Sequence, residues 1–345
     1  MTRELPAGFA PARILVIQLR QIGDVLLTTP SLRALRRRFP EATISFLVEP
    51  TPAQVLWGNP NLDEIIIRDP RGGALEPLRT IRAIRSRRFD LVVDFLGSPR
   101  TAPIALLSGA RVTISDANRR RAFLYTHPVR PQGLFTAERK LSLLAPLGCG
   151  LEPMRLDMAL PPAAREKARA WLVAQGIDRA APLAILEPFH KRWVLEYPAE
   201  GFRRLAELMV ERWGAAVVVG WGPGREAEAR ALVASAKVKL LLAPPTSLHE
   251  MAALFVEADL WVGNESGPRH IAASQGTPTF AVLGPTDDTW TPPGPEHLSV
   301  GRDDLPCRPC NLRYCPENNH SCMRDFAPEK LFARLDEFRR GREKR

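Results

Sequence analysis

The sequence predicts an α/β protein made of two doubly wound domains, and three observations support this prediction. Short continuous apolar runs alternate with amphipathic stretches, which is the pattern of buried parallel strands and covering helices. The alternation weakens across residues 119–150 and restarts after Pro161-Pro162, so it forms two blocks. A chain of 345 residues is long enough to give each block its own core. We therefore expect a first domain at 1–165, a second at 176–326, and a helix at 327–345 that packs back on the first.

The elements of the first block follow from local patterns. Arg13–Leu19 is a β-branched apolar run expected as a buried strand, and a short turn at 20–24 follows it. Val25–Phe39 is apolar on one side and Arg-rich on the other, as expected of one amphipathic helix. The remaining expected elements are strands at Thr43–Val48, Leu62–Ile67 and Leu91–Phe95 and a basic helix at Thr80–Arg88.

The second block repeats this alternation of strands and helices. The expected strands are Leu183–Glu187, Ala216–Gly220, Lys239–Ala243, Leu260–Gly263 and Thr279–Leu283. The expected helices are Glu166–Gln175, Phe202–Trp213, Glu226–Ser235, His249–Glu257, one around His270–Gln275, and a charged one at Pro328–Arg340. In open parallel sheets, ligands bind beyond the carboxyl ends of the strands. We therefore expect a cleft between the carboxyl ends of the two sheets.

Composition and charge restrict the classes of protein. No apolar run reaches the roughly 18 residues of a membrane-spanning helix, and the N-terminus lacks a signal-peptide pattern, so we expect a cytoplasmic protein. The net charge is +10, and residues 1–150 hold 22 Lys and Arg against 12 Asp and Glu. This excess indicates an anionic partner of the first domain, such as nucleic acid, an acidic glycan or a membrane surface. Because 41 of the 48 basic residues are Arg, genome composition explains the excess equally well.

The first candidate site is Gly23-Asp24, in the turn after the first strand. Ligand-contacting residues of open α/β sheets lie at this position, and glycine lets the backbone approach a ligand closely. Asp24 stands at a helix N-terminus, where an aspartate is also a favoured cap. Spacing alone favours the cap over a catalytic role.

The second candidate is the turn at 263–270, where a buried strand ends in Gly and Ser and a helix begins. Backbone amides at such a helix start bind anions, so we expect a diphosphate near Ser266 and Gly267. Glu265 is unusual beside a phosphate unless it binds backbone amides or a sugar hydroxyl. His270 lies on the first helical turn and is equally consistent with packing.

Two further loops follow strands of the second block. Lys191 comes shortly after Leu183–Glu187 and could neutralise phosphate charge, although a solvated basic loop is as consistent with the sequence. The segment 220–224 is glycine-rich and Glu226 follows it, which suits a nucleotide and its ribose hydroxyls.

Four cysteines fall within sixteen residues near the C-terminus and begin as C-x2-C: Cys307, Cys310, Cys315 and Cys322. This set could bind a structural zinc ion, remain reduced or form two disulfides. The spacing matches no standard zinc ribbon, so all three states stay open.

Two long motifs resemble the glycosyltransferase family that includes the ADP-heptose:lipopolysaccharide heptosyltransferases. They are RILVIQLRQIGDVLLTTPSLRALRRRFPEATI near the N-terminus and VGNESGPRHIAASQGTPTFAVLGPTDDTWTPPG in the second domain. HKRW and the segment from CRPC to CMRDFAPEKL are also similar, and the likeness runs from about residue 13 to residue 335. The resemblance implies a GT-B fold and inverting transfer of heptose from ADP-heptose to the Kdo/heptose inner core of lipopolysaccharide.

The resemblance also implies roles for individual residues. Asp24 matches the general base, which replaces the cap-only interpretation, and Lys191 matches a lysine that contacts the donor diphosphate. The donor-binding set is Gly23, Glu226, Glu265, Ser266, Gly267 and His270. The resemblance and the basic first half together suggest acceptor-binding arginines at Arg33, Arg36, Arg37, Arg82, Arg85, Arg119, Arg120 and Arg121. No cofactor is expected for catalysis, because no D-x-D pair is present at the expected cleft and Lys191 supplies positive charge.

The partners follow from the same resemblance. We expect an anionic lipid-linked core oligosaccharide as acceptor and peripheral contact with the cytoplasmic face of the inner membrane. The family usually has Asp where this chain has Glu265, which leaves open another nucleotide sugar and another anionic glycan. A catalytically inactive scaffold and a nucleic-acid-binding protein are further alternatives. The latter is disfavoured, because the basic residues are dispersed with little aromatic interleaving.

Overall fold

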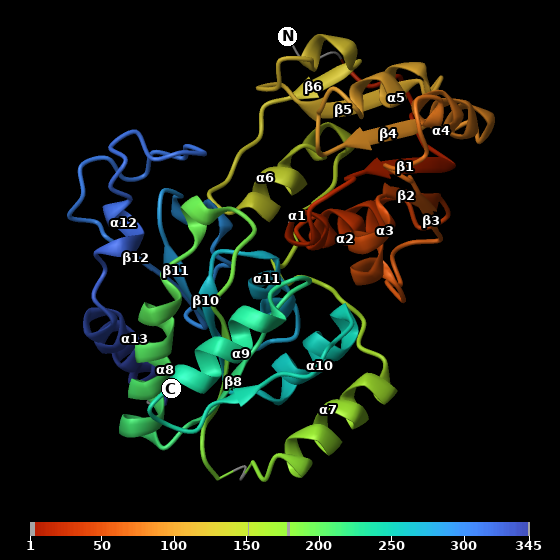
Figure 1. Ribbon diagram of the computed structural model, residues 1–345. Coiled ribbons are helices and arrows are strands. Elements are labelled where there is room, and N and C mark those ends of the chain that lie inside the picture. Colours follow the sequence, from red (N-terminus) through yellow and green to blue (C-terminus); the bar gives the residue numbers. More distant parts are fainter. Residues whose placement is uncertain (1–3, 151, 178–179, 344–345) are drawn as a thin grey trace. The chain divides into compact units, whose positions relative to one another are not determined.

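The computed structural model describes residues 4–150, 152–177 and 180–343 (Figure 1). The chain forms two compact units, unit 1 at Met1–Ala159 and unit 2 at Leu160–Arg345. Each unit contains a six-stranded sheet whose strands all run parallel. This confirms the predicted class of two doubly wound α/β domains. In the part of the chain that the structure describes, no helix has the length and apolar character to cross a bilayer.

The sheet of unit 1 has the strand order β3-β2-β1-β4-β5-β6. Its strands are β1 (Arg13–Ile17), β2 (Thr43–Val48), β3 (Glu64–Ile67), β4 (Leu91–Asp94), β5 (Val112–Asp116) and β6 (His127–Val129). Its helices are α1 (Ile22–Leu26), α2 (Thr29–Arg38), α3 (Pro50–Ala53), η1 (Gln54–Leu56), α4 (Glu76–Ser86), α5 (Ala102–Leu107), η2 (Ala122–Leu124), α6 (Thr136–Ser142) and η3 (Ala145–Leu147).

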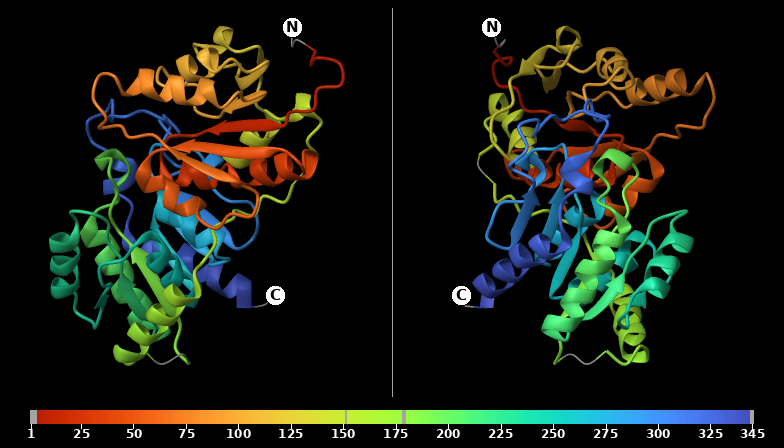
Figure 2. Two further views of the ribbon diagram at one scale, coloured as in Figure 1. Left: turned by 90° about the vertical axis from the view of Figure 1, so that its right-hand side faces the viewer. Right: turned by 60° about the vertical axis from the view of Figure 1, so that its left-hand side comes forward.

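Helices cover both faces of this sheet. Right-handed crossovers carry α1, α2 and α3 over one face and α4 and α5 over the other, as the left view of Figure 2 shows. Under α4 and α5, buried side chains of the strands and helices form one apolar cluster that includes Ile17, Ile84, Val92 and Ile104.

The helix predicted at Val25–Phe39 is two helices, α1 and α2. The hydroxyls of Thr28 and Thr29 donate to the carbonyls of Val25 and Leu26 at 2.6 and 2.8 Å, and Pro30 follows without a backbone donor. The expectation of one continuous helix was therefore wrong. The break shortens the helix that carries Asp24 to five residues.

The sheet of unit 2 has the strand order β12-β11-β10-β7-β8-β9. Its strands are β7 (Leu183–Glu187), β8 (Ala216–Val219), β9 (Leu241–Leu242), β10 (Leu260–Asn264), β11 (Thr279–Leu283) and β12 (His297–Gly301). Its helices are α7 (Pro162–Ala174), η4 (Trp193–Leu195), α8 (Ala199–Trp213), α9 (Glu226–Ser235), α10 (Leu248–Glu257), α11 (Gly267–Ser274), η5 (Asp288–Trp290), α12 (Ser321–Arg324) and α13 (Pro328–Glu343).

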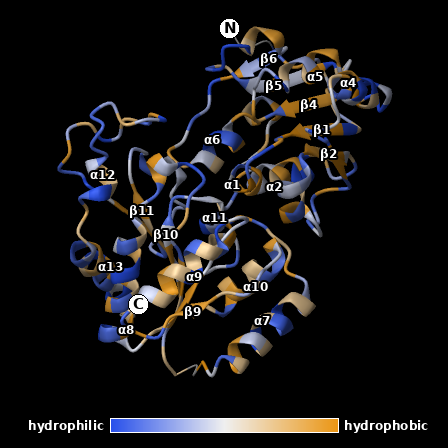
Figure 3. Cartoon of the chain, in the orientation of Figure 1, coloured by the Kyte–Doolittle hydropathy of each residue, from blue (hydrophilic) through white to orange (hydrophobic). Residues whose placement is uncertain are grey.

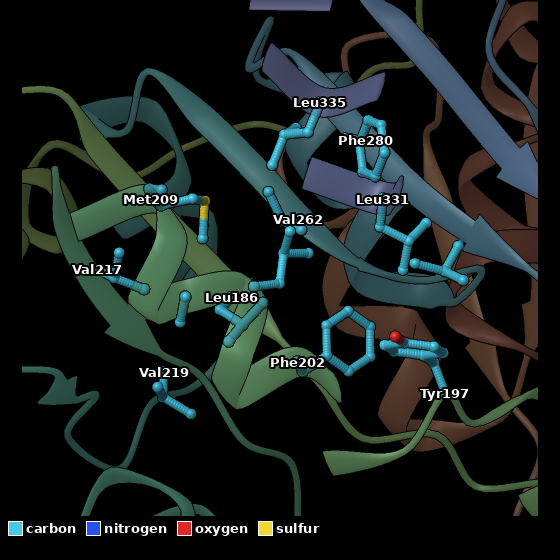
Figure 4. Close-up of a cluster of buried hydrophobic side chains, with 14 of the residues drawn as sticks. Leu186, Tyr197, Phe202, Met209, Val217, Val219, Val262, Phe280, Leu331 and Leu335 are labelled. Atoms are coloured by element: carbon cyan, nitrogen blue, oxygen red, sulfur yellow. The ribbon is translucent and has the colours of Figure 1, made fainter. Parts of the chain in front are cut away.

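The C-terminal helix α13 packs within unit 2, where we expected it against the first domain. Leu331 and Leu335 are fully buried in the core cluster of unit 2, which Figure 4 shows together with Phe280 and Val262. On α8, the Trp213 indole donates to Asp336 at 2.8 Å. The apolar stripe of α13 thus finds its partner on α8 and the sheet of its own unit.

Helix α7 also belongs to unit 2, so the expected boundary at residue 165 falls inside it. Arg165 and Arg169, one turn apart on α7, each place their Nε atom 2.9 Å from Glu257 Oε1 on α10. These ion pairs and the buried Leu172 attach the helix to the second core.

Candidate functional site

Both sheets have a topological switch point, the position where ligands bind in open parallel sheets. In unit 1 it lies between β1 and β4, and in unit 2 between β7 and β10. Asp24 follows β1, and the phosphate turn follows β10. The predicted residues thus lie at the carboxyl edges that the fold class specifies.

Asp24 is held at both carboxylate oxygens yet stays accessible. Its Oδ2 accepts a hydrogen bond from the backbone N–H of Gln21 at 3.3 Å, as in a capping box. Its Oδ1 lies 3.8 Å from the Nζ of Lys140, and 27% of the side chain is exposed. The carboxylate therefore serves the cap and can still receive a proton from a bound hydroxyl.

Lys140 is the functional residue of unit 1 that the sequence analysis missed. It lies on α6, is buried, and donates to Gln18 Oε1 at 2.9 Å and to the Asp24 carbonyl at 2.8 Å. The ring centroid of Phe95 is 5.8 Å from its Nζ. A signal was present, because Ala137, Leu141 and Lys140 share the buried side of the α6 pattern. A lysine on such a stripe indicates a buried charge.

Burial lowers the pKa of Lys140 to about 8, because the charged form loses its hydration. Asp24 and Asp94 act in the opposite direction, and Arg119 adds to the lowering. The positive charge beside Asp24 is therefore less favourable than that of an exposed lysine.

Asp94 and Arg119 form the neighbouring part of this edge. Asp94, at the end of β4, is fully buried, accepts from the Tyr125 hydroxyl at 2.7 Å, and has its pKa raised by burial. Arg119 follows β5, and a Cβ added to Gly97 would lie 2.8 Å from its Cγ. Arg119 thus lies over the loop after β4, close enough to influence Lys140.

The expected acceptor-binding arginines do not form one surface. On α2, Arg33 pairs with Asp157 and Glu152, Arg36 with Asp63 at 2.5 Å, and Arg37 with Glu152 at 3.0 Å. These three side chains tie α2 to the rest of unit 1, and their binding of the acceptor stays a prediction. Arg82 and Arg85 lie on α4, over the opposite face of the sheet (Figure 2). Among the predicted set, Arg119 lies at the carboxyl edge.

In unit 2, the phosphate turn has the expected form. Ser266 is the N-cap of α11, in an extended conformation, and Gly267 is the first helical residue. The Ser266 side chain makes no capping bond, so this hydroxyl and the Gly267 N–H are available to an anion. Pro268 has no N–H, and the Arg269 N–H donates to the Ser266 carbonyl at 3.2 Å.

Arg269, one turn later on α11, forms an ion pair with Oε2 of Glu265, while the buried Oε1 accepts no hydrogen bond from the described residues. Arg269 is fully buried and also donates to Ser299 Oγ at 2.8 Å and Thr279 Oγ1 at 3.2 Å. Burial raises the pKa of Glu265, while the ion pair acts in the opposite direction. His270 Nε2 lies 3.7 Å from Glu265 Oε1. The buried ion pair with Arg269 fixes the turn through Oε2, and a ligand contact of Glu265 stays a prediction.

The loop carrying Lys191 lies beside that turn. Lys191 is exposed, and its loop is fixed on both sides by polar bonds. The Asn264 side-chain amide donates to the carbonyl of Pro188 at 2.8 Å, and the Arg225 guanidinium donates to the Glu196 carboxylate at 2.6 Å. The free ammonium therefore projects from a positioned loop at the end of β7.

The first glycine of the segment 220–224 has a packing role, whereas a Cβ at Gly222 or Gly224 would meet open space. A Cβ at Gly220 would lie 2.2 Å from Glu187 Oε1, so this glycine makes room for a buried carboxyl rather than for a nucleotide. Burial raises the pKa of Glu187 to about 8. Glu226 begins α9 and pairs with Arg230 at 2.8 Å while half exposed, so it remains at the edge beyond β8.

The four clustered cysteines are free thiols that line one small pocket with Val194 and His320. Their burial differs, since Cys307 is exposed and Cys322 is buried in α12, where burial raises its pKa. Within the described ranges, no three His, Cys, Asp or Glu side chains are arranged to hold a metal ion. The zinc interpretation of Cys307, Cys310, Cys315 and Cys322 therefore lacks a ligand set here.

Two switch points, an accessible carboxylate and an anion-binding helix start define a nucleotide-binding α/β enzyme. Residues 78–320 match the family model described as glycosyltransferase family 9 (heptosyltransferase). The match covers more than half of the chain. The chain therefore belongs to glycosyltransferase family 9 and is a glycosyltransferase with the GT-B fold.

Similar proteins agree with this assignment. Lipopolysaccharide heptosyltransferase 3 of Escherichia coli is 29% identical over 285 residues, 78% of this chain and 83% of the relative. A family 9 glycosyl transferase from Veillonella parvula aligns with a TM-score of 0.80 at 24% identity over 98% of both chains. The E. coli heptosyltransferase WaaC, solved with ADP-2-deoxy-2-fluoro heptose, aligns with a TM-score of 0.69 at 21% identity, covering 94% of this chain and 99% of that one.

Proposed function

We propose that this enzyme transfers heptose from ADP-heptose to the Kdo/heptose inner core of lipopolysaccharide, with inversion at the anomeric carbon. The observation that carries the proposal is the Asp24 carboxylate, held at both oxygens and accessible at the switch point of unit 1. The family assignment and the nucleotide sugar bound to the WaaC neighbour support the choice of donor.

The reaction is a direct displacement. The acceptor hydroxyl gives its proton to Asp24 while its oxygen forms a bond to the anomeric carbon. The bond from that carbon to the diphosphate breaks, and ADP leaves with the electron pair. The Gly267 N–H at the start of α11, the Ser266 hydroxyl and Lys191 stabilise the charge on the leaving diphosphate. Glu226, at the start of α9, binds the ribose hydroxyls, and no metal cofactor takes part in this scheme.

The acceptor is lipid-linked and anionic in this proposal, and Arg119 at the carboxyl edge of unit 1 receives its carboxylates or phosphates. The enzyme works in the cytoplasm, at the inner face of the inner membrane. The excess of 22 basic over 12 acidic residues in the first 150 positions supports an anionic partner for unit 1.

ADP release measures the proposed reaction directly. Wild-type enzyme is incubated with ADP-heptose and a panel of truncated inner-core acceptors. We expect ADP release only when a competent acceptor is present, and a large reduction for Lys191→Ala. Exposed Lys239 serves as the matched control, and Lys239→Ala should behave as wild type. Turnover of another nucleotide sugar, with none from ADP-heptose, would contradict heptose while retaining the mechanism.

Lys140 is expected to position and polarise Asp24 in this reaction. Lys140→Met should lower kcat/KM about tenfold to a hundredfold, since a hydrogen bond to a charged group contributes about 1.5–3 kcal/mol. As pH rises through about 8 the ammonium loses its proton, so wild-type activity should fall in that range. Lys140→Arg keeps the charge and should move this fall to higher pH.

Stability should change in the opposite direction over the same range. The folded-state pKa of Lys140 lies below the ordinary 10.5, so the unfolded chain binds more protons between about pH 8 and 10.5. The contribution of Lys140 to the unfolding free energy therefore rises with pH there. If activity falls above pH 8 while the unfolding free energy does not, the loss arises at the catalytic site and not from unfolding. If wild type and Lys140→Arg show the same activity profile at high pH, Lys140 does not polarise Asp24.

A further inference from the structure

A face of unit 1 exposes large apolar side chains that no part of the mechanism uses. Helices α4, α5 and η2 pack their inner sides into the apolar cluster over β1 and β4. We call their outer side the outer helical face. It is defined by the exposed side chains Leu75, Leu78, Leu106, Leu107 and Phe123, whose exposed fractions are 58, 64, 51, 44 and 80%.

The three helices of the outer helical face are neighbours in the fold. Helix α4 contacts α5, and α5 contacts η2. Where the first two helices meet, the guanidinium of Arg85 donates to the carbonyl of Leu107 at 3.2 Å. Figure 3 shows hydrophobic and hydrophilic colour side by side on α4 and α5. Soluble proteins rarely expose large contiguous apolar patches without a partner that covers them.

The charges on this face have one sign. Along α4, the exposed side chains Leu75, Leu78, Arg82 and Arg85 follow each other at helical spacing on one stripe. The acidic residue of α4, Glu76, is buried and pairs with Arg68 at 2.5 Å. Arg79 on α4 and Arg120 before η2 are exposed as well and add positive charge.

Exposed apolar side chains beside arginines favour a lipid bilayer as the partner of the outer helical face. Exposed leucines and a phenylalanine enter the boundary between lipid headgroups and acyl chains, while arginines beside them bind anionic headgroups. A nucleic acid would take the arginines but would leave the apolar side chains in water. We propose that the outer helical face docks unit 1 onto an anionic lipid bilayer. The inference rests on the proposed function in one respect, that the acceptor is lipid-linked.

Vesicle co-sedimentation of the full-length enzyme tests the docking. One set of vesicles contains phosphatidylethanolamine and phosphatidylglycerol, and the other contains phosphatidylcholine alone. We expect salt-sensitive binding to the first set and little to the second. The double variant Leu78→Ser/Phe123→Ser should lower binding about tenfold or more, because two large apolar side chains would no longer be buried in the bilayer.

Val173→Ser is the matched control. Val173 is 76% exposed on α7 of unit 2 and lies outside the outer helical face, so its variant should bind vesicles as wild type does. Unchanged binding by the Leu78/Phe123 double variant, or equal binding of wild type to phosphatidylcholine vesicles, would overturn the proposal. The proposal would also be overturned if single-stranded oligonucleotides competed with vesicles for the enzyme and the double variant bound both as wild type does. Circular dichroism and the unfolding midpoint verify that the variant is folded.

A second readout separates this proposal from the reaction itself. Turnover is compared on a vesicle-embedded acceptor and on its water-soluble, delipidated form. Docking predicts that the double variant loses activity on the embedded acceptor at least about tenfold and keeps it on the soluble one. If wild type binds vesicles through this face but turns over neither acceptor, the proposed function fails and docking stands. If both proteins turn over both acceptors equally, docking fails and the proposed function stands.

Discussion

Replacing Asp24 with asparagine is expected to lower kcat by about a hundredfold to ten-thousandfold, the usual contribution of a general base. Asparagine keeps an oxygen that can accept from the Gln21 N–H, so the turn after β1 should stay folded. It cannot take a proton from the acceptor hydroxyl. The KM for ADP-heptose should change little, because the proposed donor contacts are made by unit 2.

Asp116→Asn is the matched control for Asp24→Asn. Asp116 ends β5 at the same edge of the sheet and lies 3.6 Å from Arg119, so it is a second acidic residue of that edge without the contact to Lys140. Its variant should retain kcat within about threefold, as expected of a residue outside the chemistry. Steady-state rates of ADP release with donor and acceptor varied separately measure both effects. A folded Asp24→Asn enzyme with a near-normal kcat would remove Asp24 from the role of base.

Replacing Arg269 with methionine is expected to lower the unfolding free energy of unit 2 by about 3–5 kcal/mol at neutral pH, the cost of leaving a buried charge without its partner. Arg269 is fully buried, and its loss leaves Glu265 without its ion-pair partner and removes one hydrogen bond each from Thr279 and Ser299. Because six of the seven tryptophans lie in unit 2, fluorescence during chemical denaturation follows this unit.

Two comparisons make the Arg269 result specific. Burial already raises the pKa of Glu265 in the wild type, and removing Arg269 takes away the interaction that opposes this. A group with a raised folded-state pKa destabilises the fold as pH rises, so the deficit of Arg269→Met should shrink at mildly acidic pH. The double variant Glu265→Leu/Arg269→Met should recover most of the loss, because no buried charge remains. A double variant as unstable as the single one would show that the ion pair is not the cause.

The local sequence pattern was sufficient to predict the bounds of the strongly apolar strands. Thr43–Val48, Leu183–Glu187 and Thr279–Leu283 were predicted at the bounds that the structure has, because each is a short, mostly apolar run buried in a parallel sheet. The elements between residues 102 and 142 were not predicted. They are helices of six and seven residues and strands of five and three, too short for a clear period.

The candidate site divides in the same way. The turn after β10 was correctly placed, because Gly and Ser between a buried strand and a helix have a local signature. The partners of its charged residues were not predicted. Glu265 was assigned to a ligand, whereas Arg269 and the hydroxyls of neighbouring strands occupy its surroundings. Gly220 was assigned to a nucleotide, whereas its missing side chain accommodates Glu187.

The sequence by itself determined the fold class, the family and the edge of each sheet at which the reaction groups lie. These depend on apolar periodicity and on motifs that are contiguous in the chain. The tertiary structure decided which charges meet. Lys140 reaches the Asp24 carbonyl across 116 positions, and Arg33, predicted to bind the acceptor, is taken by Asp157 124 positions away. Such pairs form because burial makes an unpartnered charge costly, and the fold alone determines which partner lies within reach.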